Sequence, residues 1–155
     1  MRKKINTLAT YIGLLGVTLL TACSTTSHYD ISKEYVALQA AILSNSQHIK
    51  YIEIPSHGAA GDSMAIAMKG AGNAASLRKT LVELSDEGGG TIVVTSTNPA
   101  LSKAVIEGAI SEKQSMFANT MLIYAGGPSL SMELKPLILQ SGMEYGFIDI
   151  TKTKK

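Results

Sequence analysis

Apolar side chains recur every three or four residues in four segments of the chain, which is the spacing of one face of a helix. These segments are residues 31–44, 73–87, 98–110 and a last one that starts at 129 or 131 and ends at 140. The apolar stripe of the first segment consists of Ile31, Tyr35, Leu38 and Ile42. We therefore expect four helices, and we expect this stripe to be buried against the domain that follows it.

Local signals mark the ends of three of these helices. Residues 88–90 are three consecutive glycines and should end the helix over 73–87. Asn98 followed by Pro99 is the pattern of a capping residue and a first helical position. Pro136 should kink or restart the last helix, because proline has no amide hydrogen for the helical hydrogen bond.

Four shorter segments have the pattern of β-strands. Residues 49–54 alternate in polarity and stop at Pro55, whereas residues 91–95 and 121–124 are continuous runs typical of strands buried on both faces. Residues 145–150 form the closing strand. Residues 64–68 are compatible either with a strand or with the start of a helix, and the pattern leaves the two open.

Short strands separated by helices of ten to fifteen residues are typical of βαβ units. We therefore predict an α/β fold, a small three-layer sandwich with a mostly parallel four- or five-stranded sheet, preceded by one N-terminal helix. The direction of the first strand stays open, because residues 64–68, if they form a strand, could pair with it antiparallel. A chain of 155 residues allows one domain of ordinary size, which we place at residues 30–150.

The amino terminus has the features of an export signal. Three basic residues at positions 2–4 precede the apolar residues 11–20, a stretch too short to span a bilayer. The sequence Leu20-Thr21-Ala22-Cys23 follows directly and resembles the lipobox of bacterial lipoprotein precursors. The resemblance implies that residues 1–22 are a signal peptide, that cleavage falls before Cys23, and that Cys23 carries acyl chains. Residues 23–29 would then be the lipidated cysteine and a short tether.

Removing this segment changes the charge of the protein. The full chain has 14 basic and 12 acidic residues, and cleavage removes three basic and no acidic ones, so the mature charge is negative by one. Nucleic acid is therefore not an expected partner. The acylated Cys23 should hold the protein in a lipid bilayer. Ser24 after the cysteine suggests, by the sorting pattern of such lipoproteins, the outer membrane facing the periplasm. Residues 151–155 should be a basic tail.

Candidate chemistry gathers where the predicted strands end. The carboxyl ends of parallel strands share one edge of a sheet, where a crevice forms if the strand order reverses. The residues at these ends are Ser56, His57, Gly58 and Gly61, then Ser96 and Asn98, then Gly126, Gly127 and Ser129. They could form a pocket for a small anion, because free N–H groups at helix starts attract negative charge. They are equally the ordinary residues of turns and caps.

Several catalytic and cofactor signatures do not occur. Residues 70–75 fit the loose dinucleotide pattern G-x-G-x-x-A, but no acidic residue ends the next strand to bind a ribose. The chain has no phosphate-binding P-loop and no G-x-S-x-G elbow. Ser56, His57, Asp62 and Ser63 share one loop, where neighbours rarely form a triad. The three histidines lack metal-ligand spacing. We expect no cofactor and no metal. Met64 and Met68 share a helical spacing, and we expect the other mature methionines, Met116, Met121, Met132 and Met143, to fill the core.

Two functions remain after these exclusions. The first is a non-catalytic envelope lipoprotein whose α/β domain docks or assembles with another envelope protein. The second is a domain that binds a small anionic ligand or a glycan, or a weak hydrolase, using the loops at the strand ends. The second requires a concave polar pocket at that edge. The first requires an exposed apolar patch or an open strand edge.

Overall fold

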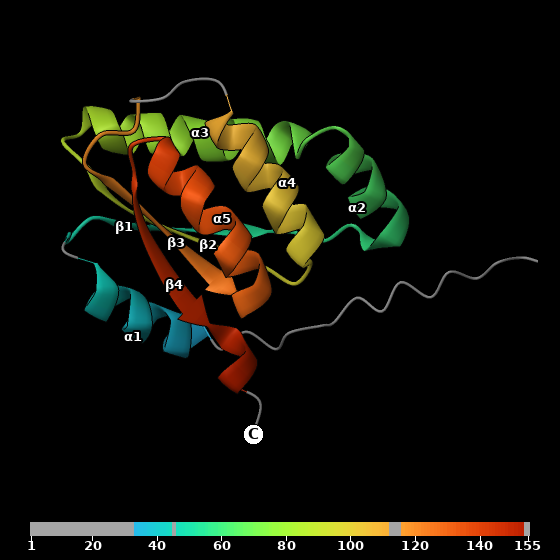
Figure 1. Ribbon diagram of the computed structural model, residues 1–155, viewed down its shortest axis with the longest axis horizontal. Helices are drawn as coiled ribbons and strands as arrows, with labels where there is room; N and C mark the ends of the chain where they lie inside the picture. The colour runs from blue at the N-terminus through green and yellow to red at the C-terminus, as the bar shows by residue number, and fades with distance from the viewer. Residues whose placement is uncertain (1–32, 45, 112–115, 154–155) are drawn as a thin grey trace, which may run out of the picture.

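The computed structural model describes residues 33–44, 46–111 and 116–153. Four parallel strands form its sheet, β1 (Ile49–Ile54), β2 (Gly90–Ser96), β3 (Thr120–Gly126) and β4 (Glu144–Asp149). They lie side by side in the order of the chain, so β1 and β4 are the two outer strands (Figure 1). The predicted parallel α/β fold is confirmed, and the first strand is parallel. The predicted signal peptide, Cys23 and the tether lie outside the described residues.

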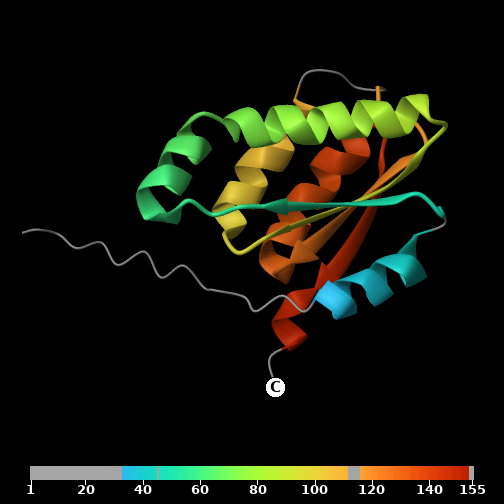
Figure 2. The same ribbon diagram turned by 180° about the vertical axis from the view of Figure 1, so that it is seen from behind.

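Helices cover the two faces of the sheet unequally. The connections contain α2 (Gly58–Ala67), α3 (Ala71–Asp86), α4 (Pro99–Ile110) and α5 (Pro128–Gln140). Because each connection moves one strand further in the same direction, all four helices lie on the same side of the sheet, where α3, α4 and α5 pack on the strands and α2 packs on α4 (Figure 2). The preceding helix, α1 (Lys33–Leu43), lies on the other face (Figure 1). The result is the expected three layers, with a single helix in the third.

Residues 64–68 belong to α2 and its end, so they are not a strand. Two helices therefore fill the connection from β1 to β2, and Gly70 separates them with a φ of +78°. A side chain at this position would collide with the backbone of Val105 in α4. The first glycine of the dinucleotide-like pattern thus lies between two helices, and the second, Gly72, lies within α3. Neither follows a strand, which is where that motif would bind a pyrophosphate.

Two groups of buried side chains flank the sheet. The larger group lies beneath α3, α4 and α5 and contains Leu77, Leu101 and Leu134. The smaller lies beneath α1 and contains Val93 and Ile123. Strands β2 and β3 are buried on both faces, as their continuous apolar runs predict.

The predicted face of α1 is confirmed at Tyr35 and wrong at Leu38 and Ile42. Tyr35 packs against the sheet beside Val36 and Ala40, whereas Leu38 is 61% and Ile42 67% exposed. The remaining residue of the stripe, Ile31, lies outside the described residues. Apolar residues surround most of α1, so their period alone does not select the side that meets the sheet. The small side chain of Ala40 lets the helix approach closely, and Ser44 Oγ lies 2.6 Å from Thr91 Oγ1 of β2.

The other element ends differ slightly from their predicted positions. Helix α5 starts at Pro128, with Gly127 as its cap, and it continues through Pro136 without a break. The closing strand ends at Asp149, and Ile150–Thr153 form a 3₁₀ turn where the basic tail was predicted to begin. Within the described ranges, no helix is both long and apolar enough to cross a bilayer.

Candidate functional site

The loops predicted to carry chemistry lie at the carboxyl-terminal edge of the sheet, after β1, β2 and β3. A crevice at that edge requires a reversal of strand order, because neighbouring connections then diverge to opposite faces. The order β1-β2-β3-β4 has no reversal, so the sheet does not open a crevice in this way. The site must therefore be described from the contacts of its side chains.

The carboxylate of Asp62 lies at the centre of this edge. It is 2% exposed and accepts three hydrogen bonds, from Ser56 Oγ at 2.7 Å, from the His57 backbone N–H at 2.8 Å and from Asn98 Nδ2 at 2.7 Å. Ser56 and His57 follow β1, whereas Asn98 follows β2. Asp62, in the second turn of α2, therefore joins the two loops.

These contacts keep Asp62 ionised. Burial by itself raises the pKa of the carboxyl group, because it removes the charge from water. The hydrogen bonds from Asn98, Ser56 and His57, together with the charge of His57, act in the opposite direction and outweigh burial, so the pKa of Asp62 lies below its ordinary value. An ionised carboxylate is an acceptor only, and its three donors all come from the protein.

A serine, a histidine and an aspartate meet here, but they do not form a relay. In a catalytic triad the histidine lies between the serine and the carboxylate. Here the Ser56 hydroxyl donates directly to Asp62, and His57 contributes its backbone N–H while its side chain is exposed. Gly61 packs against His57 so closely that a Cβ there would lie 2.7 Å from the histidine Cβ. The arrangement holds the start of α2 rather than activating a nucleophile.

The second loop is a helix cap. Asn98 Oδ1 accepts from the backbone N–H groups of Ala100 and Leu101 at 3.1 and 3.3 Å, which confirms the predicted cap of α4. Ser96 Oγ accepts from the backbone N–H of Asn98 at 3.0 Å. The free donors that could have bound an anion at this helix start are thus bonded to the Asn98 side chain.

The third loop lies apart from the other two. Gly127 and Ser129 line a groove of about 330 Å³ between the starts of α4 and α5. An ion pair between Lys103 and Glu133 lines the same groove, so its charges are already balanced. Gly126 is buried beneath the ring of Tyr124, where a side chain would not fit. The predicted residues are therefore divided between the network around Asp62 and this groove.

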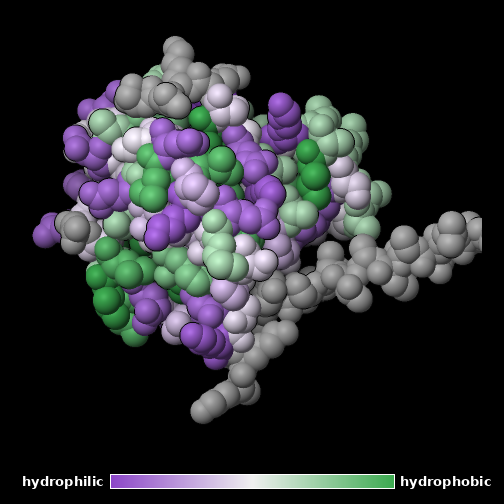
Figure 3. Space-filling model, viewed as in Figure 1, coloured by the Kyte–Doolittle hydropathy of each residue, from purple (hydrophilic) through white to green (hydrophobic). Residues whose placement is uncertain are grey.

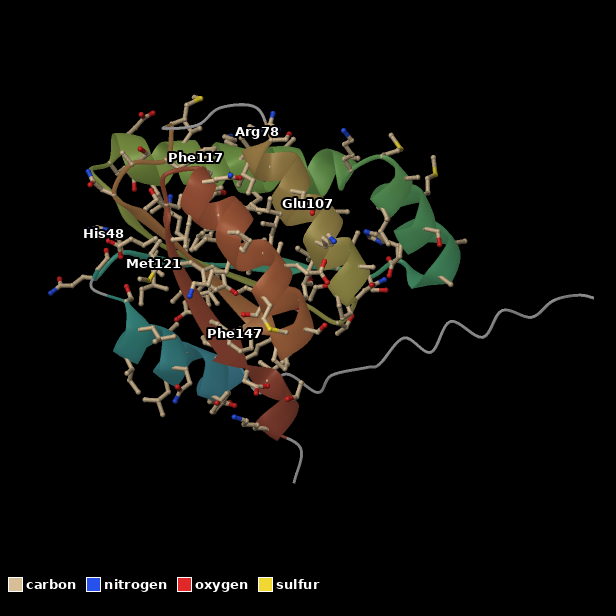
Figure 4. The ribbon with its side chains drawn as sticks, in the orientation of Figure 1. His48, Arg78, Glu107, Phe117, Met121 and Phe147 are labelled. Atoms are coloured by element: carbon tan, nitrogen blue, oxygen red, sulfur yellow. The ribbon has the colours of Figure 1, made fainter. Side chains whose placement is uncertain are left out.

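The opposite edge of the sheet carries a polar hollow of about 500 Å³ that the sequence did not predict. Its lining includes His48, Glu87, Asn119, Met121 and Glu144, and Figure 4 shows His48 and Met121 at this end of the sheet. The neighbouring backbone N–H groups of residues 88–91 donate to carbonyl groups of the protein itself. With two carboxylates and no free donor among those amides, this hollow does not favour an anionic ligand.

An apolar groove of about 390 Å³ separates α2 from α4. Ile66 and Ala104 lie in it, and Lys69, Lys103 and Glu107 supply its charges. On α2 and at its end, Met64 and Met68 expose 67% and 57% of their surface. The sequence contains one signal for this surface, since these two methionines share a helical spacing. Of the methionines expected to fill the core, Met143 is buried, but Met116 and Met132 are exposed, so the expectation is wrong for Met116 and Met132.

Sequence reasoning also missed the role of Asp62. It is the one charged residue of α2, and a lone aspartate in a glycine-rich loop predicts an ordinary turn residue. Its partner Asn98 is 36 positions further along the chain, so their contact exists only in the folded protein.

Groups that could hold a metal ion, with three or more histidine, cysteine, aspartate or glutamate side chains, do not occur within the described part of the chain. Comparison with known proteins gave no significant similarity to any protein-family model, curated protein or solved structure.

Proposed function

We propose that this chain is a lipid-anchored protein of the bacterial envelope and that its α/β domain is a non-catalytic module that binds another envelope protein. The observation that carries the binding role is the uncharged, exposed surface of α2. The anchor rests on the resemblance of residues 20–23 to a lipobox, and the placement at the outer membrane facing the periplasm rests on Ser24 after the cysteine.

Helix α2 exposes almost nothing that would favour contact with water. Its single charge, Asp62, is buried, and its outward positions include Ala60, Met64, Ala67 and, just after the helix, Met68. The hydroxyl of Ser63, which is also exposed, donates to the backbone oxygen of Ala59 at 2.7 Å. Exposed helices normally carry charged residues on the side that faces solvent. Methionine side chains are flexible and polarizable, which suits them to bind partner surfaces. This surface is therefore typical of a helix that another protein covers.

The adjoining groove between α2 and α4 adds a place for a partner side chain. Its apolar part near Ile66 and Ala104 can take up an aliphatic or aromatic group, while Lys69 can pair with an acidic group beside it. An anchor residue that fills a pocket next to an apolar helix is the common arrangement at binding hot spots. We expect a partner that presents an apolar side chain beside a carboxylate.

The alternative function, binding of a small anion or a glycan or weak hydrolysis at the strand ends, has less support. Ser56, the His57 backbone and Asn98 all donate to Asp62, so their donors serve the structure of the edge. A ligand at this point would have to replace three short bonds to a buried carboxylate.

Site-specific photo-crosslinking in the native envelope tests the proposal. A photoreactive amino acid replaces Met64 in the full-length, lipidated protein, and the matched control carries it at Met132 of α5, which is 73% exposed on a different helix. We expect one defined protein adduct from position 64 and none from position 132. The pair of changes Met64→Glu and Met68→Glu should abolish co-purification of that partner, whereas Met132→Glu should preserve it. Retention of the partner by the α2 variant would overturn the proposal.

A further inference from the structure

We propose that α1 lies flat on the bilayer that holds Cys23, with Leu38 and Ile42 inserted at the boundary between headgroups and acyl chains. This inference rests on the lipid anchor of the proposed function, but it concerns a different surface from the one that binds the partner. It assigns a second membrane contact and a fixed orientation to the domain.

Helix α1 is apolar on two sides. After Lys33 and Glu34 it contains no charged residue up to its end at Leu43. One side packs on the sheet through Val36 and Ala40, and the other exposes Leu38 and Ile42. A helix that is hydrophobic around most of its circumference is normally covered on both sides. Figure 3 shows the exposed side as a green patch at the lower left, over the position that α1 has in Figure 1.

The surroundings of this patch suit the boundary of a membrane. Tyr51 of β1 lies on the same face of the sheet as α1, because it is two positions before Glu53 in the strand, and Glu53 pairs with Lys33 of α1 at 3.2 Å. Tyr51 is 52% exposed. Tyrosine is enriched at the level of the headgroups, and lysine can extend its charge to the water while its stem stays in contact with apolar surface.

The short segment between Cys23 and α1 supports the bilayer as the surface that covers Leu38 and Ile42. Ten residues, 23–32, separate the acylated cysteine from the helix, and they can span at most about 35 Å. The anchor thus keeps α1 close to the bilayer in every copy of the protein, at a high effective concentration. A partner protein or a second copy would have to be recruited to the same place. Weak affinity for the interface is therefore sufficient for α1 to remain bound.

This contact would orient the domain. Helices α3 to α5 cover the face of the sheet opposite α1, and α2 packs on α4 on that same side, so binding of α1 to the bilayer directs α2 away from it (Figures 1 and 2). The surface proposed to bind another protein then faces the periplasm. The two apolar surfaces of the molecule would therefore have two different occupants.

Depth-dependent fluorescence quenching tests the inference on the full-length, lipidated protein. In variants Leu38→Cys and Ile42→Cys the new thiol is the one free for labelling, because Cys23 is the single natural cysteine and carries the lipid. An environment-sensitive dye is attached, and the protein is reconstituted into vesicles of phosphatidylethanolamine with some phosphatidylglycerol. Met132→Cys is the matched control on the opposite face. Both α1 positions are exposed, so the substitutions should leave folding unchanged.

We expect the dye at positions 38 and 42 to shift to shorter wavelength, to lose most of its quenching by iodide and to be quenched severalfold by nitroxide-labelled lipid. The dye at 132 should remain open to iodide. Equal access of iodide to all three positions on vesicles would overturn the inference. Protection without lipid quenching would also overturn it, in favour of a protein or a second copy on α1. Failure of the wild-type protein to float with the vesicles would refute the anchor itself, which is a separate result.

Discussion

Removal of the Asp62 carboxylate should weaken the whole carboxyl-terminal edge of the sheet. Asp62→Ala deletes the acceptor of three hydrogen bonds that join the end of β1, the start of α2 and the cap of α4. Asp62→Asn keeps the shape of the side chain but replaces one acceptor oxygen by an NH₂ group. This group is a donor, and it would face the donors that bond to the carboxylate in the wild type. Both changes should lower the free energy of unfolding while they leave the apolar core unchanged.

The expected loss in the free energy of unfolding depends on what surrounds each donor. A hydrogen bond to a charged group contributes ~1.5–3 kcal/mol. Ser56 is exposed and Asn98 partly so, and both can bond to water once the carboxylate is gone. The three bonds therefore do not add in full, and we expect a loss of about 2–4 kcal/mol for Asp62→Ala. That is a large part of a total stability of ~5–15 kcal/mol.

The effect should depend on pH with a definite sign. The pKa of Asp62 is lowered in the folded protein, so the unfolded chain takes up its proton first as the pH falls. The stabilisation is complete above the unfolded pKa of about 3.9 and is lost as the pH falls through the folded value. The difference between wild type and Asp62→Asn should thus be constant near neutrality and shrink below about pH 4.

Urea unfolding followed by circular dichroism measures this difference. The midpoint should fall in both Asp62 variants while the slope stays unchanged, since the area exposed on unfolding is the same. Asp86→Asn, at the exposed end of α3, is the matched control and should change stability by less than about 0.5 kcal/mol. A loss of under about 0.5 kcal/mol for Asp62→Ala would refute the structural role assigned to the network.

Three further results are expected. Cys23→Ala should release the protein from the membrane fraction, and mass spectrometry of the wild type should find acyl chains on an N-terminal Cys23; an N-terminus elsewhere would contradict this. Ile123→Ala removes a fully buried side chain from the central strand β3 and should cost ~2–5 kcal/mol in urea unfolding, against less than ~1 kcal/mol if the position were peripheral. His57→Ala should change stability by less than about 0.5 kcal/mol, because its imidazole is exposed. Loss of envelope function in a stably folded His57→Ala protein would instead favour a site at the strand ends.

Patterns confined to a few neighbouring residues predicted the structure well. The runs that became β2 and β3 contain β-branched and aliphatic side chains without alternation, and both strands are buried on both faces. Asn98 and Pro99 cap α4 as their spacing indicates, and the glycines after α3 end that helix. These signals depend on local backbone geometry and on total apolar content, both of which are properties of the sequence itself.

The sequence by itself therefore determined the class of fold, the central strands, the cap of α4 and the end of α3, and the proposed anchor rests on the resemblance of its residues 20–23 to a lipobox. Only the tertiary structure decided which face of α1 is buried, because Val36 and Leu38 are both apolar and the choice depends on the shape of the sheet opposite. Likewise, the strand order, and with it the lack of a reversal, depends on how the connections pack together. The bond between Asp62 and Asn98 joins residues 36 positions apart, and no periodicity in either segment encodes a contact between them.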